Sequence, residues 1–214
     1  MLVELCGGDW NSPPHSHPDH LAFRWRGRRR GAVYWIQFEA QLVLALVFTW
    51  SAAAKLFSPA TFTTLKRSVA VLARVPGPWS SWAPHALVTA EAALAGGLLV
   101  PAAAKVSLAL AILLLTVFTV VLRRAVSRAV PVPCGCFGPS NRPVGRVQLF
   151  RNAALLTIAL SGLAAGMTAP PHGPVPVPVA GVALCLWAAL TLAICFALWD
   201  EFAGLLAPAA SGHR

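Results

Sequence analysis

Five long apolar runs dominate the pattern of hydrophobic and polar positions, and short polar or proline-rich stretches separate them. The runs cover about residues 34–57, 84–100, 105–122, 149–167 and 179–199. A helix of roughly 20 apolar residues spans the hydrocarbon core of a bilayer, and each run is close to that length. The pattern therefore predicts an all-α protein, a polytopic transmembrane helical bundle with about five spans.

A sixth segment, residues 61–75, has a different pattern. Leu65, Val69 and Leu72 recur at helical spacing, whereas Lys66 and Arg67 fall on other faces. Apolar residues on one face and basic residues on another are typical of a helix that lies in the membrane interface. We expect an amphipathic surface helix between the first two spans.

Composition strengthens the membrane assignment, because 57% of the residues are hydrophobic and only 11% are charged. So few charges suit a protein whose main solvent is the lipid bilayer. The formal net charge of +10 would suggest nucleic acid in a soluble protein. Here the basic residues sit between or before the apolar runs, which is typical of topology and headgroup anchors. We expect no nucleic-acid partner.

The same pattern divides the chain into regions. The first region is basic and rich in proline, and it includes His15, His17 and His20, whose spacing does not fix a metal site. We predict a disordered amino-terminal tail at residues 1–32 and a membrane core at 33–168, with a long loop at about 123–148. A proline-rich linker at 169–178, an extra transmembrane helix at 179–205 and a frayed end at 206–214 follow.

The charges give a divided answer on orientation. Five arginines precede the first span, which favours a cytoplasmic amino terminus and places the 123–148 loop outside after three crossings. However, the loops on the outer side would then carry the larger share of basic residues. A cysteine pair in that loop favours the outside, since disulfides persist in oxidising compartments. We therefore expect a multi-pass protein of the cytoplasmic membrane with an extracytoplasmic loop.

That loop contains Cys134 and Cys136, which are separated only by Gly135. The sulfurs can pair only if the backbone bends sharply, and glycine permits such a bend. A small strained ring is easily reduced, which suits a disulfide that is passed on to another protein. Two adjacent thiolates also suit Cu(I), so copper handling is an alternative. Cys185 and Cys195 are ten residues apart on one helix and cannot pair within it, so we expect them to be small apolar fillers.

Several features of the chain resemble, in their order, the family of the methylamine utilisation protein MauE, within a wider group of DoxX-like redox-associated membrane proteins. The first span ends near Lys55, Glu91 lies in the second, a Cys-Gly-Cys-Phe-Gly block follows the third, and Arg151 and Asn152 open the fourth. In that block Phe137 and Gly138 follow the cysteines. The resemblance covers about residues 38–167. It implies a four-helix membrane core, so the basic tail, the proline linker and the fifth span depart from the family.

The resemblance also implies a function. Members of the family are associated with maturation or export of a disulfide-rich secreted subunit of methylamine dehydrogenase, alongside a thioredoxin-like redox protein. We therefore expect a thiol-redox accessory protein, more a maturation factor than an enzyme with its own substrate, in which Cys134 and Cys136 exchange disulfides. No cofactor or resident metal is expected. The alternatives are a copper-handling membrane protein and a small transporter or structural subunit.

Three charged residues are expected to support the membrane core and the cysteine pair. Lys55 and Glu91 are expected to meet across a helix hairpin as a structural pair, because an isolated charge in the membrane is costly. Alternatively, Lys55 snorkels to the headgroups. Arg151 either favours the thiolate form of a nearby cysteine or contacts lipid phosphate.

Overall fold

The computed structural model describes residues 18–72, 79–128, 145–168 and 178–198, and side chains within residues 31–69, 82–128, 145–168 and 178–198. In these ranges the chain forms six helices and no strand, which confirms the predicted all-α helical bundle. The helices are α1 (Pro18–Phe57), α2 (Pro59–Leu72), α3 (Trp79–Leu99), α4 (Ala104–Ser127), α5 (Arg146–Thr168) and α6 (Val179–Ala197).

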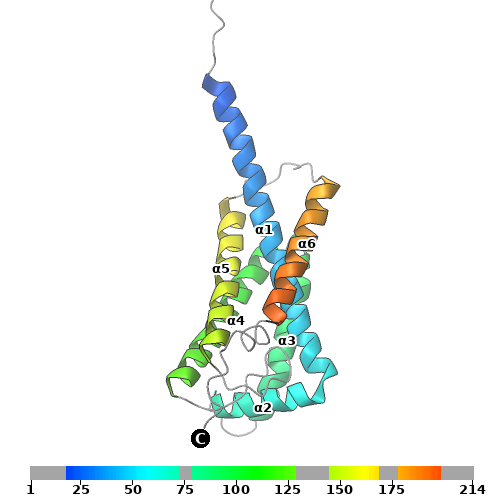
Figure 1. Cartoon of the computed structure of the whole chain (residues 1–214), viewed down its shortest axis with the longest axis vertical. Coiled ribbons are helices and arrows are strands. Elements are labelled where there is room, and N and C mark those ends of the chain that lie inside the picture. Colours follow the sequence, from blue (N-terminus) through cyan, green and yellow to red (C-terminus); the bar gives the residue numbers. More distant parts are fainter. Residues whose placement is uncertain (1–17, 73–78, 129–144, 169–177, 199–214) are drawn as a thin grey trace, which may run out of the picture.

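Helix α1 is the centre of the bundle (Figure 1). Its apolar part packs against α3, α5 and α6, and α4 packs against α5 and α3. The shared core is built from aliphatic side chains of all these helices, including Leu44, Leu98, Leu108, Leu155 and Ala189. At one crossing the backbones come very close, because a Cβ atom added to Gly162 would lie 2.6 Å from the Cβ of Ala40. Small residues at such positions let membrane helices approach closely.

Four helices are long and apolar enough to cross a membrane: α1 over Gly31–Phe57, and the whole of α4, α5 and α6. Helix α3, the predicted second span, is less apolar than these four and is not among them. The polar residues of helix α3 lie between Ser80 and Glu91, and they lower its mean hydropathy. Its place in the bundle therefore depends on packing against α1 as well as on apolarity.

The amino-terminal boundary of the first helix also differs from the prediction. Residues 18–32 were expected to belong to a disordered tail, but α1 begins at Pro18 and continues without a break to Phe57. Proline is favoured in the first turn of a helix, and the alanines and arginines that follow are good helix formers. Figure 1 shows this part of α1 extending well beyond the ends of the neighbouring helices.

Helix α2 confirms the predicted amphipathic segment. Leu65 is buried, whereas Lys66 and Arg67 are exposed. The helix lies crosswise at the end of the bundle where α1 ends and α3 begins (Figure 1). Its buried face contacts α3 and α1, so it connects these two antiparallel helices across their shared end.

Candidate functional site

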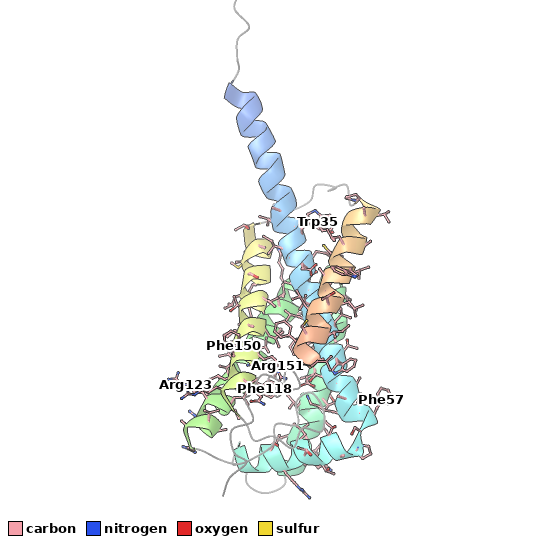
Figure 2. The ribbon with its side chains drawn as sticks, viewed as in Figure 1. Trp35, Phe57, Phe118, Arg123, Phe150 and Arg151 are labelled. Carbon is pink, nitrogen blue, oxygen red and sulfur yellow. The ribbon has the colours of Figure 1, made fainter. Side chains whose placement is uncertain are left out.

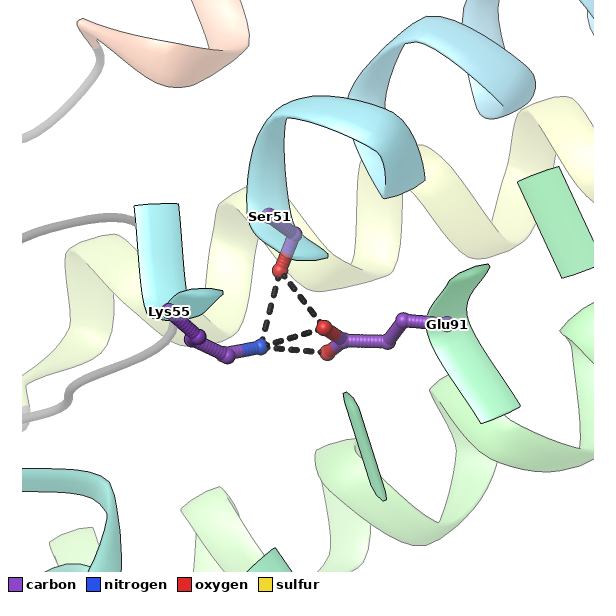
Figure 3. A network of polar contacts seen from close by, with 3 residues as sticks. All are labelled: Ser51, Lys55 and Glu91. Atoms are coloured by element: carbon purple, nitrogen blue, oxygen red, sulfur yellow. Dashed lines mark hydrogen bonds and ion pairs between the residues drawn. The ribbon is translucent and has the colours of Figure 1, made fainter. Parts of the chain in front are cut away.

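A buried ionic cluster joins α1 to α3 near that end of the bundle (Figure 3). The ammonium group of Lys55 donates hydrogen bonds to both carboxylate oxygens of Glu91, at 2.5 and 2.6 Å. It also donates to the hydroxyl oxygen of Ser51 at 2.9 Å, and that hydroxyl donates to Glu91 Oε2 at 3.2 Å. Lys55 and Glu91 are each only 2% exposed, so the pair lies inside the protein.

The cluster follows from helical spacing. Ser51 and Lys55 are four residues apart, which places them on one face of α1. Glu91 lies on the helix that packs against this face. The predicted pairing is therefore confirmed, and the alternative in which Lys55 snorkels to the headgroups is wrong. Glu91 lies about three turns from the start of α3, which begins at Trp79.

A second polar group lies at the start of α5. The carboxamide nitrogen of Asn152 donates to the carbonyl oxygen of Leu115 at 2.8 Å and to Thr119 Oγ1 at 2.6 Å, both in α4. Gln148 Oε1 accepts a hydrogen bond from the backbone N–H of Gly145 at 2.8 Å. This bond satisfies a backbone donor at the start of the helix, as half of a capping box does. These contacts fix the first turns of α5 against α4.

Arg151 is only 3% exposed, so it does not face lipid phosphate as our alternative interpretation required. Figure 2 shows Arg151 and Phe118 inside the bundle, whereas Arg123 points outward. Arg151 and Asn152 line a cavity of about 30 Å³ together with Ser51 and Glu91. A space of roughly 10–15 Å³ already accommodates a water molecule. The cavity thus connects the two polar groups through a small, partly polar space within an otherwise apolar core.

The predicted redox block, Cys134, Gly135, Cys136, Phe137 and Gly138, lies outside the described residues. Its attachment points are described, since α4 ends at Ser127 and α5 begins at Arg146, and these helices pack against each other. The segment that carries the cysteines is therefore held at both ends by a fixed helix pair. Of the predicted supporting residues, the structure brings together Lys55 with Glu91, and both Arg151 and Asn152 with the cavity beside them.

The two cysteines that the structure describes lie in α6. Cys185 is partly buried and Cys195 is exposed, and neither forms a disulfide, as their spacing predicted. The interpretation of both as packed fillers is wrong for Cys195.

Among the described residues, no group of three or more His, Cys, Asp or Glu side chains is arranged to hold a metal ion.

The sequence interpretation missed three residues of these groups. Ser51 has a signal in its spacing of four residues from Lys55 within an apolar helix. Gln148 has one as well, because a glutamine in the first turn of a helix is typical of a capping box. Thr119 has no comparable signal, because its role depends on the rotation of α4 relative to α5.

The comparisons with known proteins agree with this architecture. No curated protein and no solved structure gives a significant match to the chain. The family described as methylamine utilisation protein MauE matches residues 31–165, which is well over half of the chain. The match begins in α1 at the start of its apolar part, includes the ionic cluster and the Asn152 contacts, and ends before α6. The chain is thus a multi-pass membrane protein that belongs to the MauE family of methylamine utilisation.

Proposed function

We propose that the chain is a membrane thiol-redox accessory protein, which assists disulfide formation, maturation or export of a secreted client of the methylamine dehydrogenase type. Cys134 and Cys136 carry the exchange. The observation that most supports the proposal is the attachment of their segment, because both flanking helices are locked to each other by the Asn152 bonds to Leu115 and Thr119. A short segment held at fixed ends can present a strained Cys-x-Cys disulfide to a partner protein.

The exchange requires no bound cofactor. A client thiolate attacks one sulfur of the Cys134–Cys136 disulfide, forms a mixed disulfide and releases the other sulfur as a thiolate. A second client thiolate then displaces the first cysteine, so the client becomes oxidised and the pair is reduced by two electrons. A thioredoxin-like partner in its disulfide form reoxidises the pair by the same chemistry in reverse. The two protons of the client thiols pass to water or to neighbouring bases.

The proposed location of this reaction is the extracytoplasmic face of the cytoplasmic membrane. It is supported by the five arginines that precede the first span and by the persistence of disulfides in oxidising compartments. A membrane-impermeant maleimide should label Cys134 and Cys136 in intact cells after mild reduction. Labelling only after the cells are opened would contradict this location.

Trapping of mixed disulfides tests the reaction itself. The single variants Cys134→Ser and Cys136→Ser each leave one thiol of the pair, and at least one variant should accumulate a covalent adduct that reducing agent releases. We expect a thioredoxin-like protein or a secreted disulfide protein in the adduct. A matched control removes the two α6 thiols, Cys185→Ser and Cys195→Ser, and should leave the adduct unchanged. If the adduct persists when Cys134 and Cys136 are both replaced, the proposal is wrong.

The buried ionic cluster favours a second candidate, a small transporter or structural subunit in which Lys55 and Glu91 act and the cysteines are incidental. Its basis is the small cavity that Glu91 shares with Arg151. One experiment distinguishes the two candidate functions. If Glu91→Gln abolishes maturation of the client at normal protein levels, while the double cysteine variant stays active, the second candidate replaces the first.

A further inference from the structure

A groove opens on the bundle far from the ionic cluster, near the turn that joins α3 to α4. It has a volume of about 190 Å³, and its lining includes Tyr34, Gln37, Phe38 and Gln41 of α1, opposite Leu98 and Pro101. Tyr34 precedes Lys55 by 21 residues on the same helix, which corresponds to about 30 Å along the axis. The groove is therefore at the opposite end of the bundle from the cysteine-bearing segment.

Three polar side chains of α1 form a stripe along the groove. Tyr34, Gln37 and Gln41 are spaced by three and four residues, so they lie on one face of α1. Within the described part of the chain, no hydrogen bond joins the carboxamide of Gln37 or Gln41 to another group. Polar groups at membrane depth are costly without a partner, because lipid tails offer none. The groove therefore presents two amides whose hydrogen-bonding capacity is available to a ligand.

The position of Gln37 depends on a glycine of α5. A Cβ atom added to Gly166 would lie 2.9 Å from the carboxamide carbon and oxygen of Gln37. The end of the Gln37 side chain thus packs directly over the Gly166 backbone. A methyl group at residue 166 would displace this flexible carboxamide at little cost to the helix packing. Gly166 accordingly leaves room for Gln37 in its present position beside the groove.

Size and charge identify the class of ligand. Sites for whole small molecules usually have volumes of roughly 300–1,000 Å³, so this groove accommodates only part of a molecule. A lipid fits this description, because its acyl chains stay in the bilayer. The surroundings are basic: Lys105 is exposed beside the lining residue Ala104, and Arg30 precedes Tyr34 by one helical turn. Tyr34 and Trp35 are of the residue types enriched at the membrane interface.

We propose that this groove binds one anionic phospholipid. The carboxamides of Gln37 and Gln41 donate to the oxygens of the glycerol and phosphate region. Lys105 attracts the negative headgroup, since a basic residue near an anionic membrane surface strengthens binding. This site goes beyond the proposed redox function and is independent of it, because none of its residues belongs to the cysteine segment or to the ionic cluster.

Native mass spectrometry of the full chain in detergent tests the site. After removal of bound lipid, the protein is titrated with phosphatidylglycerol and, separately, with phosphatidylcholine. We expect a single phosphatidylglycerol adduct, with clearly tighter binding than for phosphatidylcholine. Replacement of both amides in Gln37→Leu, Gln41→Leu should weaken phosphatidylglycerol binding by about tenfold, as loss of two membrane hydrogen bonds predicts. Lys105→Gln should weaken it by about fivefold, since one basic contact is lost.

Lys105→Gln and the further variant Gly166→Ala keep the test decisive if the double amide variant does not fold. Gly166→Ala retains both amides but displaces Gln37, and should weaken phosphatidylglycerol binding without lowering the melting temperature. Matched controls are Lys66→Gln on α2 and Thr116→Val with Thr157→Val on exposed faces, which should bind as the unaltered chain does. Equal binding of the two lipids, or unchanged binding by Lys105→Gln and Gly166→Ala, would overturn the proposal.

Discussion

Helices α3 and α6 both pack against α1, but they differ in what holds them there. Helix α3 is less apolar than the other long helices, and it carries the buried carboxylate that bonds Lys55. Helix α6 is strongly apolar, yet only 17% of its most apolar stretch is buried, against 50% for α1. Specific polar contacts thus hold the helix inside the family match, whereas apolarity holds the helix that lies outside it.

The largest expected effect on the packing of α3 against α1 comes from replacing Glu91. Glu91→Ala would leave the Lys55 ammonium buried without its partner, and we expect the free energy of unfolding to fall by about 3–5 kcal/mol. Equilibrium unfolding in mixed micelles measures this loss. The double variant Lys55→Met, Glu91→Met should recover most of it, because two apolar side chains of similar volume replace the pair. A single variant as stable as the double variant would show that the ion pair does not anchor α3.

The α6 side of the comparison depends on Gly181, where the contact is steric. A Cβ atom at this position would lie 2.8 Å from the Trp35 ring. Gly181→Ala should therefore loosen α6 and cost about 1–3 kcal/mol, as overpacking does. A lipid-soluble maleimide should then label the partly buried Cys185 faster, while labelling of the exposed Cys195 serves as the internal reference.

A matched control for this substitution exists in α3. Gly96 has no atom within 4 Å of an added Cβ, so Gly96→Ala should leave the Cys185 labelling rate unchanged. If Gly181→Ala also leaves the rate unchanged, the Trp35 contact does not position α6, and lipid alone determines where this helix lies.

The smallest expected effect concerns the attachment of α5 to α4. Asn152→Leu removes the bonds to Leu115 and Thr119 and should lower the free energy of unfolding by about 1 kcal/mol, since each of these two membrane hydrogen bonds contributes only about 0.6 kcal/mol on average. Thr119 retains its own bond to the Leu115 carbonyl oxygen. We also expect this variant to trap clearly less mixed disulfide, although it remains folded, because the cysteine segment is anchored here. Ser161→Ala, at an exposed site on the same helix, is the control.

The sequence predicted most of this architecture, because each of its signals is local. The apolar runs located α1, α4, α5 and α6, and the basic-apolar alternation located α2. The Lys55–Glu91 pair was also predictable, since the insertion cost of each charge demands a partner and a hairpin offers one. The family resemblance was carried by the order of these charges around the cysteine block, and the match over residues 31–165 confirms it.

Properties that depend on helix rotation or on tertiary packing were not predictable. Hydropathy located α3 but could not show its start at Trp79 or its bond to α1, so its length was misjudged. The Asn152 contact requires the register of α4 against α5, which no residue spacing contains. The helical continuation through residues 18–32 was missed because its basic composition resembles a disordered tail, although Pro18 is a good helix start.

The buried pair also has a consequence for how the protein is made. An isolated carboxylate at the centre of an inserting helix costs about 2.5–3.5 kcal/mol, and α3 has little surplus apolarity to offset it. Lys55 is synthesised first, on a helix that inserts readily. Cotranslational insertion of α3 therefore depends on α1 remaining beside the translocon exit until Glu91 emerges, so that the two helices leave it together as an already neutralised hairpin.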